Sequence, residues 1–473
     1  MIGSNEPSPA AGAAPPSGRV VVAAATGALG GFLFGFDSSV INGAVGAIEA
    51  QFEASGFVLG FAVSAALIGA ALGAWFAGRL ADRLGRVRVM LIAAIVFLIS
   101  GLGSGLAFAI WDLTIWRFVG GAAIGAASVI APAYIAEIAP ARMRGRLGSL
   151  QQLAIVIGIF AALLTDALLA NIAGGASAEL WFGLEAWRWM FISIVIPAGI
   201  YGLASLRLPE SPRYLVARRR VGDARRVLER YVGGEPDTKI AEIEESLRSD
   251  KPFSLSDLRG PALGLLPIVW AGILLSVFQQ FVGINVIFYY STVLWQAVGF
   301  TEEDSFTISV ITSVTNVLTT LIAIALVDRV GRKPLLLTGS AGMAVTLGTL
   351  SFLFGTAPLV ESGGELAPQL GPVAGPVALV AANLFVVFFG ATWGPIVWVL
   401  LGEMFNNRIR ASALALAAAA QWIANWIVTT TFPPLSEVSL GLAYGLYTLF
   451  AVISFVFVWR MIRETKGREL EEM

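Results

Sequence analysis

The feature that most constrains this chain is a short charged stretch between two long apolar runs. Residues 78–88 (GRLADRLGRVR) carry four arginines and an aspartate. The apolar run before them, residues 57–77, and the run after them are each about 20 residues long, which matches the hydrocarbon thickness of a bilayer. A tight charged loop between two such runs predicts a helical hairpin whose turn lies at a membrane surface.

The same charged loop occurs a second time, as DRVGRK at residues 328–333, with Asp82 and Asp328 separated by 246 positions. A second motif repeats at an offset of 266, as a glutamate and an arginine seven positions apart: Glu137 with Arg144, and Glu403 with Arg410. The polar loop around residues 362–375 can absorb the difference between the two offsets. The chain therefore reads as two copies of a six-span unit, an architecture typical of secondary transporters.

We predict an all-α membrane protein with twelve transmembrane helices in two six-helix halves. The N-terminal half, residues 20–207, contains predicted spans at residues 20–43, 57–77, 89–110, 113–138, 147–170 and 189–206. The C-terminal half, residues 261–462, contains predicted spans at residues 261–295, 307–327, 335–354, 377–401, 411–432 and 440–462. Residues 208–260 are a predicted cytoplasmic linker, with surface helices at 217–231 and 239–247 or, alternatively, a solvated chain without them.

The charge composition indicates the class of protein and the orientation of its spans in the membrane. Charged residues make up 13% of the chain, against roughly 25% in soluble domains. Of the 31 lysines and arginines, 28 flank the spans or fill the linker on one side, so the positive-inside rule predicts that both termini are cytoplasmic. Residues 1–19 are expected to form a disordered tail without the order of a cleaved signal peptide, and residues 463–473 a second tail. No basic patch lies outside the membrane flanks, so no nucleic-acid partner is expected.

The absence of cysteine and histidine limits the chemistry. Thiol catalysis, disulfides and cysteine metal sites are excluded, and any proton chemistry must use carboxylates. We find no nucleophile–base pair, metal cluster or phosphate loop, so we expect neither an enzyme nor a metal or other cofactor, with the proton as the coupling ion. Small residues at every fourth position, as at Gly31 and Gly35, predict closely packed helices rather than a binding role.

Uncharged amides and indoles inside the spans are the candidate substrate site. The seventh span reads QQFVGINVIFYYS, in which Gly283 permits a helix break between Gln280 and Asn285. Other spans also contain amides and tryptophans. Polar groups within a membrane are costly and usually functional, so these residues are candidates for the same site. Amides offer donors and acceptors and an aromatic face suits a sugar ring, so the set favours a polyol site. For any single amide, an interhelical hydrogen bond is an equally good interpretation.

Asp37 is the only acid inside the first span, and Arg117 is the only base that we place within a span. Counting residues from the span ends puts both charges at a similar depth, about 9 Å below the outer surface for Asp37. A static buried ion pair is one interpretation. The other is a proton switch whose acid is exposed to water and then sealed as the halves rock. In a chain without histidine, we expect no other buried side chain to be as good a proton carrier.

The motifs resemble the sugar porter family of the major facilitator superfamily, which includes bacterial proton-linked symporters and mammalian glucose facilitators. The matching stretches include GGFLFGFD, RFVGGAAIG, PESPRYL, QQFVGINVIFYYS, GPIVWVLLGEMF and RETKGRELEE, and they cover nearly the whole chain. Three positions depart from the family pattern: Phe36 replaces a common tyrosine, Arg463 replaces a proline, and Gly390 replaces a glutamate of the mammalian proteins.

The resemblance implies a role for each matching residue. The positions that match the family's sugar contacts are Gln152, Gln279, Gln280, Asn285, Asn316, Trp398, Gln421 and Asn425. Tyr289 and Tyr290 match its outer gate. The positions that match its cytoplasmic latch are Asp82, Arg83, Arg86, Glu137 and Arg144, with Asp328, Arg329, Arg332, Glu403 and Arg410 in the second half. The proton-linked members carry aspartate at the position of Asp37.

These features predict a proton-coupled monosaccharide symporter of the cell membrane, with a hexose or pentose as substrate and alternating access as its mechanism. We expect the lipid bilayer and the sugar to be its partners and a single chain to be functional. An uncoupled facilitator is the first alternative. A membrane sugar sensor is the second, although the tail of eleven residues after the last span is short for an output module.

Overall fold

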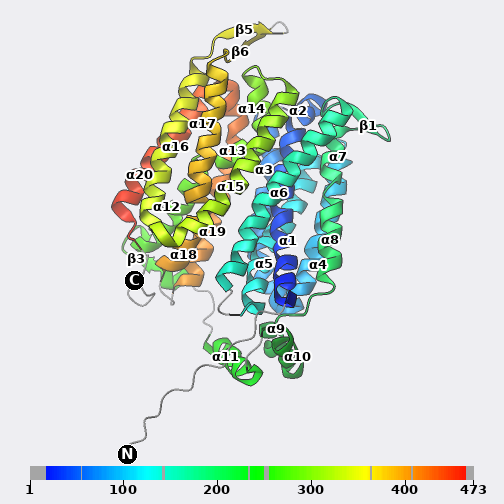
Figure 1. Ribbon diagram of the computed structural model, residues 1–473, viewed down its shortest axis with the longest axis vertical. Coiled ribbons are helices and arrows are strands. Elements are labelled where there is room, and N and C mark those ends of the chain that lie inside the picture. The colour runs from blue at the N-terminus through cyan, green and yellow to red at the C-terminus, as the bar shows by residue number, and fades with distance from the viewer. Residues whose placement is uncertain are drawn as a thin grey trace, which may run out of the picture.

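The computed structural model describes residues 18–54, 56–140, 144–232, 235–249, 255–362, 365–405 and 409–464. Over these residues the chain forms two helical groups that stand side by side, with a small group of helices below them (Figure 1). Twelve segments are helical, long and apolar enough to cross a membrane. The predicted all-α architecture with twelve membrane spans is confirmed.

The N-terminal half begins with a span that is longer than predicted. Its helix is interrupted at Val40 and continues to Phe52, so that the membrane segment covers Gly18–Phe52 rather than residues 20–43. The helices of this half are α1 (Gly18–Ser39), α2 (Ile41–Phe52), α3 (Gly56–Leu84), α4 (Arg86–Gly105), α5 (Ile110–Ile138), α6 (Arg144–Ala173), α7 (Ala186–Ile192) and α8 (Val195–Ser205).

The C-terminal half contains two interrupted spans. Gly283, with φ of 80°, separates the first two helices of its first span, which confirms the predicted break. A π-helical turn interrupts its fourth span. The elements of this half are α12 (Pro267–Phe281), α13 (Ile284–Tyr289), α14 (Ser291–Ala297), α15 (Glu302–Val330), α16 (Arg332–Gly355), α17 (Ala374–Phe388), η4 (Phe389–Trp393), α18 (Gly394–Met404), α19 (Arg410–Val438) and α20 (Leu440–Met461).

Short elements mark the two ends of the bundle. The linker forms α9 (Pro212–Ala217), α10 (Val221–Val227), the π-turn η2 (Leu228–Val232), α11 (Pro236–Ser249) and the 3-10 turn η3 (Leu255–Leu258). Three two-stranded antiparallel hairpins pair β1 (Glu179–Trp181) with β2 (Leu184–Glu185), β3 (Arg259–Gly260) with β4 (Gly264–Leu265), and β5 (Leu359–Ser362) with β6 (Glu365–Pro368). We call the end with α9–α11 the linker face and the end with β5–β6 the hairpin face (Figure 1).

Glycines allow the helices within the N-terminal half to touch, as their spacing predicted. A Cβ built on Gly35 of α1 would lie 1.9 Å from the carbonyl oxygen of Ile155 on α6. A Cβ on Gly69 of α3 would lie 2.0 Å from the carbonyl oxygen of Phe118 on α5. Only glycine permits backbones to approach this closely, so the small-residue stripes have a packing role.

The two halves are joined by hydrogen bonds toward the hairpin face. At the start of α3, the Gly56 N–H donates to Glu437 Oε1 of α19 over 2.7 Å, and two turns further along Ser64 and Thr430 share a 2.6 Å hydroxyl contact. The Ala176 N–H donates to Glu302 Oε1 over 2.9 Å. These hydrogen bonds hold the two halves together at the hairpin face, which is closed.

Candidate functional site

Gln279 and Gln280 lie at the end of α12, directly before the break at Gly283. Both are buried, with exposed fractions of 3% and 7%. The Gln279 amide donates to the carbonyl oxygens of Trp393 (2.9 Å) and Gly394 (3.1 Å), where η4 passes into α18. Its Oε1 has no partner among the described groups. This amide therefore ties two interrupted helices together and leaves one buried acceptor unpaired among the described groups.

The two sides of the broken helix are connected by a second amide pair. Asn285 Nδ2, in the first turn of α13, donates to Gln280 Oε1 over 2.7 Å. On an unbroken helix these side chains would point about 140° apart, so the left-handed conformation of Gly283 makes the contact possible. The pair leaves the Gln280 amide nitrogen and the Asn285 oxygen for other partners.

Three further amides come from α15 and α19, which pack against α13. Asn316 of α15 is 7% exposed, and a Cβ at Gly390 would lie 3.4 Å from its Oδ1. Asn425 of α19 is buried and its Oδ1 accepts from the Thr429 hydroxyl over 3.2 Å. Gln421, one turn earlier on α19, has a buried Oε1 without a partner among the described groups. The C-terminal half thus brings six predicted sugar-contacting amides onto neighbouring helices.

The other two predicted sugar contacts are placed differently. Gln152 is half-buried on α6, in the N-terminal half, and α6 packs against α15 of the other half. Trp398 lies on α18 with 44% of its surface exposed, whereas Trp393, one turn before it, is fully buried and donates to Leu336 and Ser340. Trp398 is therefore the indole with an accessible face, and Trp393 is a packing residue.

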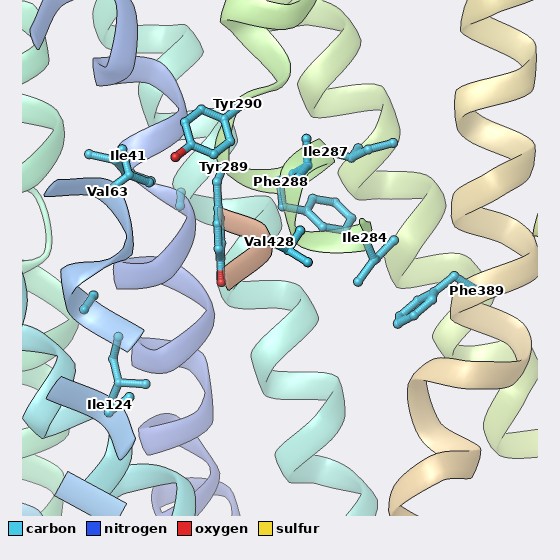
Figure 2. Close-up of a cluster of buried hydrophobic side chains, with 14 of the residues drawn as sticks. Ile41, Val63, Ile124, Ile284, Ile287, Phe288, Tyr289, Tyr290, Phe389 and Val428 are labelled. Atoms are coloured by element: carbon cyan, nitrogen blue, oxygen red, sulfur yellow. The ribbon is translucent and has the colours of Figure 1, made fainter. Parts of the chain in front are cut away.

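Tyr289 and Tyr290, the predicted outer gate, occupy the end of α13 and the junction with α14. Both rings are buried, and the Tyr290 hydroxyl donates to the Thr429 carbonyl oxygen over 2.9 Å. In the view of Figure 2, the two rings lie toward Ile41 and Val63 of the N-terminal half and away from Phe389. The Tyr289 side chain lies near Asn425 of α19 and Ser38 of α1, one residue from each half.

Asp37 and Arg117, predicted from sequence to lie at a similar depth, are in direct contact. Both are buried, with exposed fractions of 4% and 3%. Arg117 Nη1 of α5 donates to the Asp37 carbonyl oxygen of α1 over 2.8 Å and to its carboxylate Oδ2 over 3.3 Å. The guanidinium lies 5.8 Å from the centroid of the Phe191 ring. Both charges lie within electrostatic reach of Tyr289.

The predicted latch residues form the same pair in each half. Arg86 binds Glu137 through two hydrogen bonds of 3.0 Å and also contacts Asp82 at 3.1 Å. Arg332 binds Glu403 in the same forked geometry, at 2.7 and 3.1 Å. These pairs connect helices within one half. The side chains of Arg144, Asp328 and Arg410 lie outside the described set, and those of Arg83 and Arg329 are exposed.

A family model described as Sugar (and other) transporter matches residues 23–473. The chain belongs to this family. A glucose transport protein of Synechocystis is 57% identical over 96% of this chain and 97% of its own length. The D-xylose-proton symporter of Escherichia coli is 36% identical over 94% of this chain and 93% of its own. The xylose transporter of that organism, in a partially occluded inward open conformation, matches with a TM-score of 0.81 and 33% identity over 96% of this chain and all of that one. Membership of this family makes the protein a multi-pass membrane transporter and not an enzyme.

Two glutamates that sequence reasoning missed complete the repeated motif of this sugar transporter. Glu210, from PESPR, accepts from the Arg86 and Val87 N–H groups at the start of α4, over 2.9 and 3.3 Å. Glu464, from RETKG, accepts from the Arg332 and Lys333 N–H groups at the start of α16, both over 3.0 Å. They are 254 positions apart, close to the other repeat offsets, which is the signal that could have found them. The cap forms although Arg463 stands where a proline is usual.

Asp37 is not the only fully buried acid within the spans. Asp166 of α6 has an exposed fraction of 0%. The expectation that Asp37 is the best proton carrier among the buried side chains stays a prediction, and Asp166 is a second candidate. The sequence shows an acid within an apolar run at this position, but only the packing of α6 against α1 and α2 shows that it is sealed.

Proposed function

We propose that this protein is a proton-coupled symporter that carries a monosaccharide, a hexose or pentose, into the cell by alternating access. The observation that carries the proposal is the contact between Asp37 and Arg117 beside Tyr289. A proton that neutralises Asp37 weakens its attraction for Arg117, and this change occurs next to a residue that lies between the halves. We propose that this electrostatic change couples the proton to the movement of the gate.

The amides of the C-terminal half support a sugar as the substrate. Buried polar atoms are nearly always hydrogen-bonded, yet Gln279 Oε1 and Gln421 Oε1 lack partners among the described groups. Sugar hydroxyls can donate to both oxygens, and the accessible face of Trp398 suits the C–H face of a pyranose. Among the described side chains that the C-terminal half buries at this depth, the polar groups are uncharged, which disfavours a phosphate ester or a cationic substrate.

The relatives support the coupling and the choice of sugar. One is named a D-xylose-proton symporter and another, more similar, a glucose transport protein. Glucose is accordingly the first sugar to test, and xylose the second. The excess of lysine and arginine at the linker face supports cytoplasmic termini, so the hairpin face is proposed to be the outer surface. Both halves of the proposed site come from one chain, which supports a functional monomer.

Uptake into proteoliposomes tests the proposal. Purified protein is reconstituted, and accumulation of radiolabelled glucose and xylose is measured with and without an inward proton gradient. We expect concentrative uptake only with the gradient and sugar exchange without it. Exchange that is unaffected by the gradient and never concentrative would identify an uncoupled facilitator instead. Binding of sugar without exchange would identify a sensor.

A further inference from the structure

Asp166 is a buried carboxylate that the proposed symport mechanism does not use. It lies near the hairpin end of α6, and its Oδ2 accepts from the Gly43 N–H of α2 over 3.2 Å. Its Oδ1 is buried and has no partner among the described groups. The contact is tight, since a Cβ at Gly43 would lie 2.6 Å from the Asp166 Cβ. One hydrogen bond is little compensation for burying a charged carboxylate.

Among the side chains that the structure describes, no charged group compensates Asp166. On the elements that pack against α6, the charged groups toward the hairpin face are Asp37, Glu49, Asp112, Arg117, Glu179, Arg188 and Glu302 to Asp304. The two bases are engaged elsewhere, Arg117 with Asp37 and Arg188 with Glu185 at 2.6 Å. Glu302 accepts from the Ala176 N–H. Among the described side chains, Asp166 therefore has no basic partner.

The residue next to Gly43 joins the two halves. Asn42 Oδ1 accepts from the Thr292 N–H of α14 over 3.4 Å, and its carbonyl oxygen accepts from the Thr292 hydroxyl over 2.5 Å. Asn42 and Thr292 are both buried, as is Gly43 beside them. Thr292 follows the gate residue Tyr290 by two positions. Asp166 thus holds the segment of α2 that seals against α14 when the hairpin face is closed.

We propose that Asp166 is a second proton-binding site of the transport cycle, which must be neutral for the hairpin face to close. Closure seals the carboxyl group away from water without a basic partner, and a neutral acid is far less costly to bury than a carboxylate. When α14 separates from α2, water reaches the group and the proton can leave. Acidic solution at this face favours closure, and alkaline solution favours opening.

The labelling rate of a single introduced cysteine measures the opening of the hairpin face, because the chain contains no cysteine of its own. Gly46→Cys on α2 faces α14, and its Cβ would lie 3.8 Å from Val293, an ordinary contact. Phe182→Cys, at a position with 93% of its surface exposed, provides the intrinsic reactivity of a free thiol at each pH. Purified protein in detergent is labelled with a maleimide between pH 5.5 and 8, and the Gly46→Cys rate is divided by the Phe182→Cys rate.

The decisive comparison uses an Asp37→Asn background, which removes the other proposed proton carrier. We expect the normalised rate to rise about 5-fold or more with pH, the lower end of typical coupling, and to vary less than about 2-fold after Asp166→Asn. Asp166→Ser is the second variant if the first does not give a monodisperse protein. The same pH dependence in the Asp166 variants as in the background would overturn the proposal.

The Asn42→Ala variant distinguishes an effect of the proton on Asp166 from an effect of the hydrogen bonds between α2 and α14. This variant removes part of the contact with Thr292 but no titratable group, so labelling should be faster at every pH with the dependence retained. Loss of the dependence in Asn42→Ala would show that hydrogen bonding at the seam, and not a proton on Asp166, controls the gate. The assay requires neither transport nor a known orientation, so its outcome is independent of whether the protein is a symporter.

Discussion

The two halves share one fold and a repeated linker-face motif, but they bury different polar groups. Within the described spans, the N-terminal half buries the charged side chains Asp37, Arg117, Asp166 and Arg188. The C-terminal half buries amides and hydroxyls at the corresponding depth, and its one buried charge, Arg332, lies at the linker end of α16. The repeat therefore preserves the scaffold and the arginine–glutamate pairs of the linker face, while the membrane interior has diverged.

This difference suggests a division of labour. A charge inside a membrane is expensive and persists where function requires it, so the N-terminal half is suited to binding protons. Amides can bind a neutral polyol without a charge to neutralise, so the C-terminal half is suited to binding sugar. Tyr289 lies where the two meet, near Ser38 of one half and Asn425 of the other.

The largest expected effect comes from removing the charge of Asp37, which the N-terminal half buries. Asp37→Asn should abolish proton-driven accumulation, because no proton is then exchanged at the contact with Arg117. One-to-one coupling converts each pH unit, about 1.4 kcal/mol, into at most about tenfold accumulation, so a gradient of two units separates mutant from wild type by up to about 100-fold. Sugar exchange between preloaded vesicles should persist.

Glu303→Gln is the matched control for this prediction. Glu303 is an exposed acid in the first turn of α15, and its loss should leave accumulation intact. If Asp37→Asn still concentrates sugar when the outside is acidified, the proton is carried elsewhere and Asp166 becomes the first candidate.

The second prediction tests whether the two latches are equivalent. Glu137→Gln and Glu403→Gln each weaken a forked arginine pair, and each should shift the resting population toward the state open at the linker face. A network of this kind is expected to couple the halves by about 1–3 kcal/mol. A cysteine reporter in the linker-side cavity measures the shift. Equal labelling in wild type and both variants would refute the latch hypothesis.

Local patterns in the sequence were sufficient to predict the spans, the repeat and the break at Gly283. They also placed Asp37 and Arg117 at one depth, because residue counts from two span ends give depth directly. They could not show which acid is sealed, since the burial of Asp166 depends on the approach of Gly43 from another helix. The Asn42 contact with Thr292 was equally inaccessible, because it joins residues 250 positions apart. The hairpins and the interruption at Val40 carry no strong local signal.

The third prediction concerns the C-terminal half. Gln280→Ala should weaken sugar binding by roughly 3–30-fold, since it removes one neutral hydrogen bond and leaves the Asn285 donor without its acceptor. Gln296→Ala, an exposed amide on α14, is the control and should bind normally. Affinity is measured by equilibrium exchange at several pH values and compared at each one. An altered pH dependence in Gln280→Ala, at unchanged affinity, would break the division of labour between the halves.

The smallest effect is expected at Trp398. An aromatic face contributes about 0.5–1.5 kcal/mol beyond the area it buries, so Trp398→Ala should weaken sugar binding by roughly 2–12-fold, and Trp398→Phe should recover most of the loss. Because Trp398 is 44% exposed, its removal should leave thermal stability nearly unchanged. Trp393→Ala provides the contrast, since this fully buried indole donates to Leu336 and Ser340 and its loss should destabilise the protein. Thermal unfolding with and without sugar separates the two effects. If Trp398→Ala unfolds as early as Trp393→Ala while keeping full affinity, Trp398 is a packing residue and the sugar lies against another part of the C-terminal half.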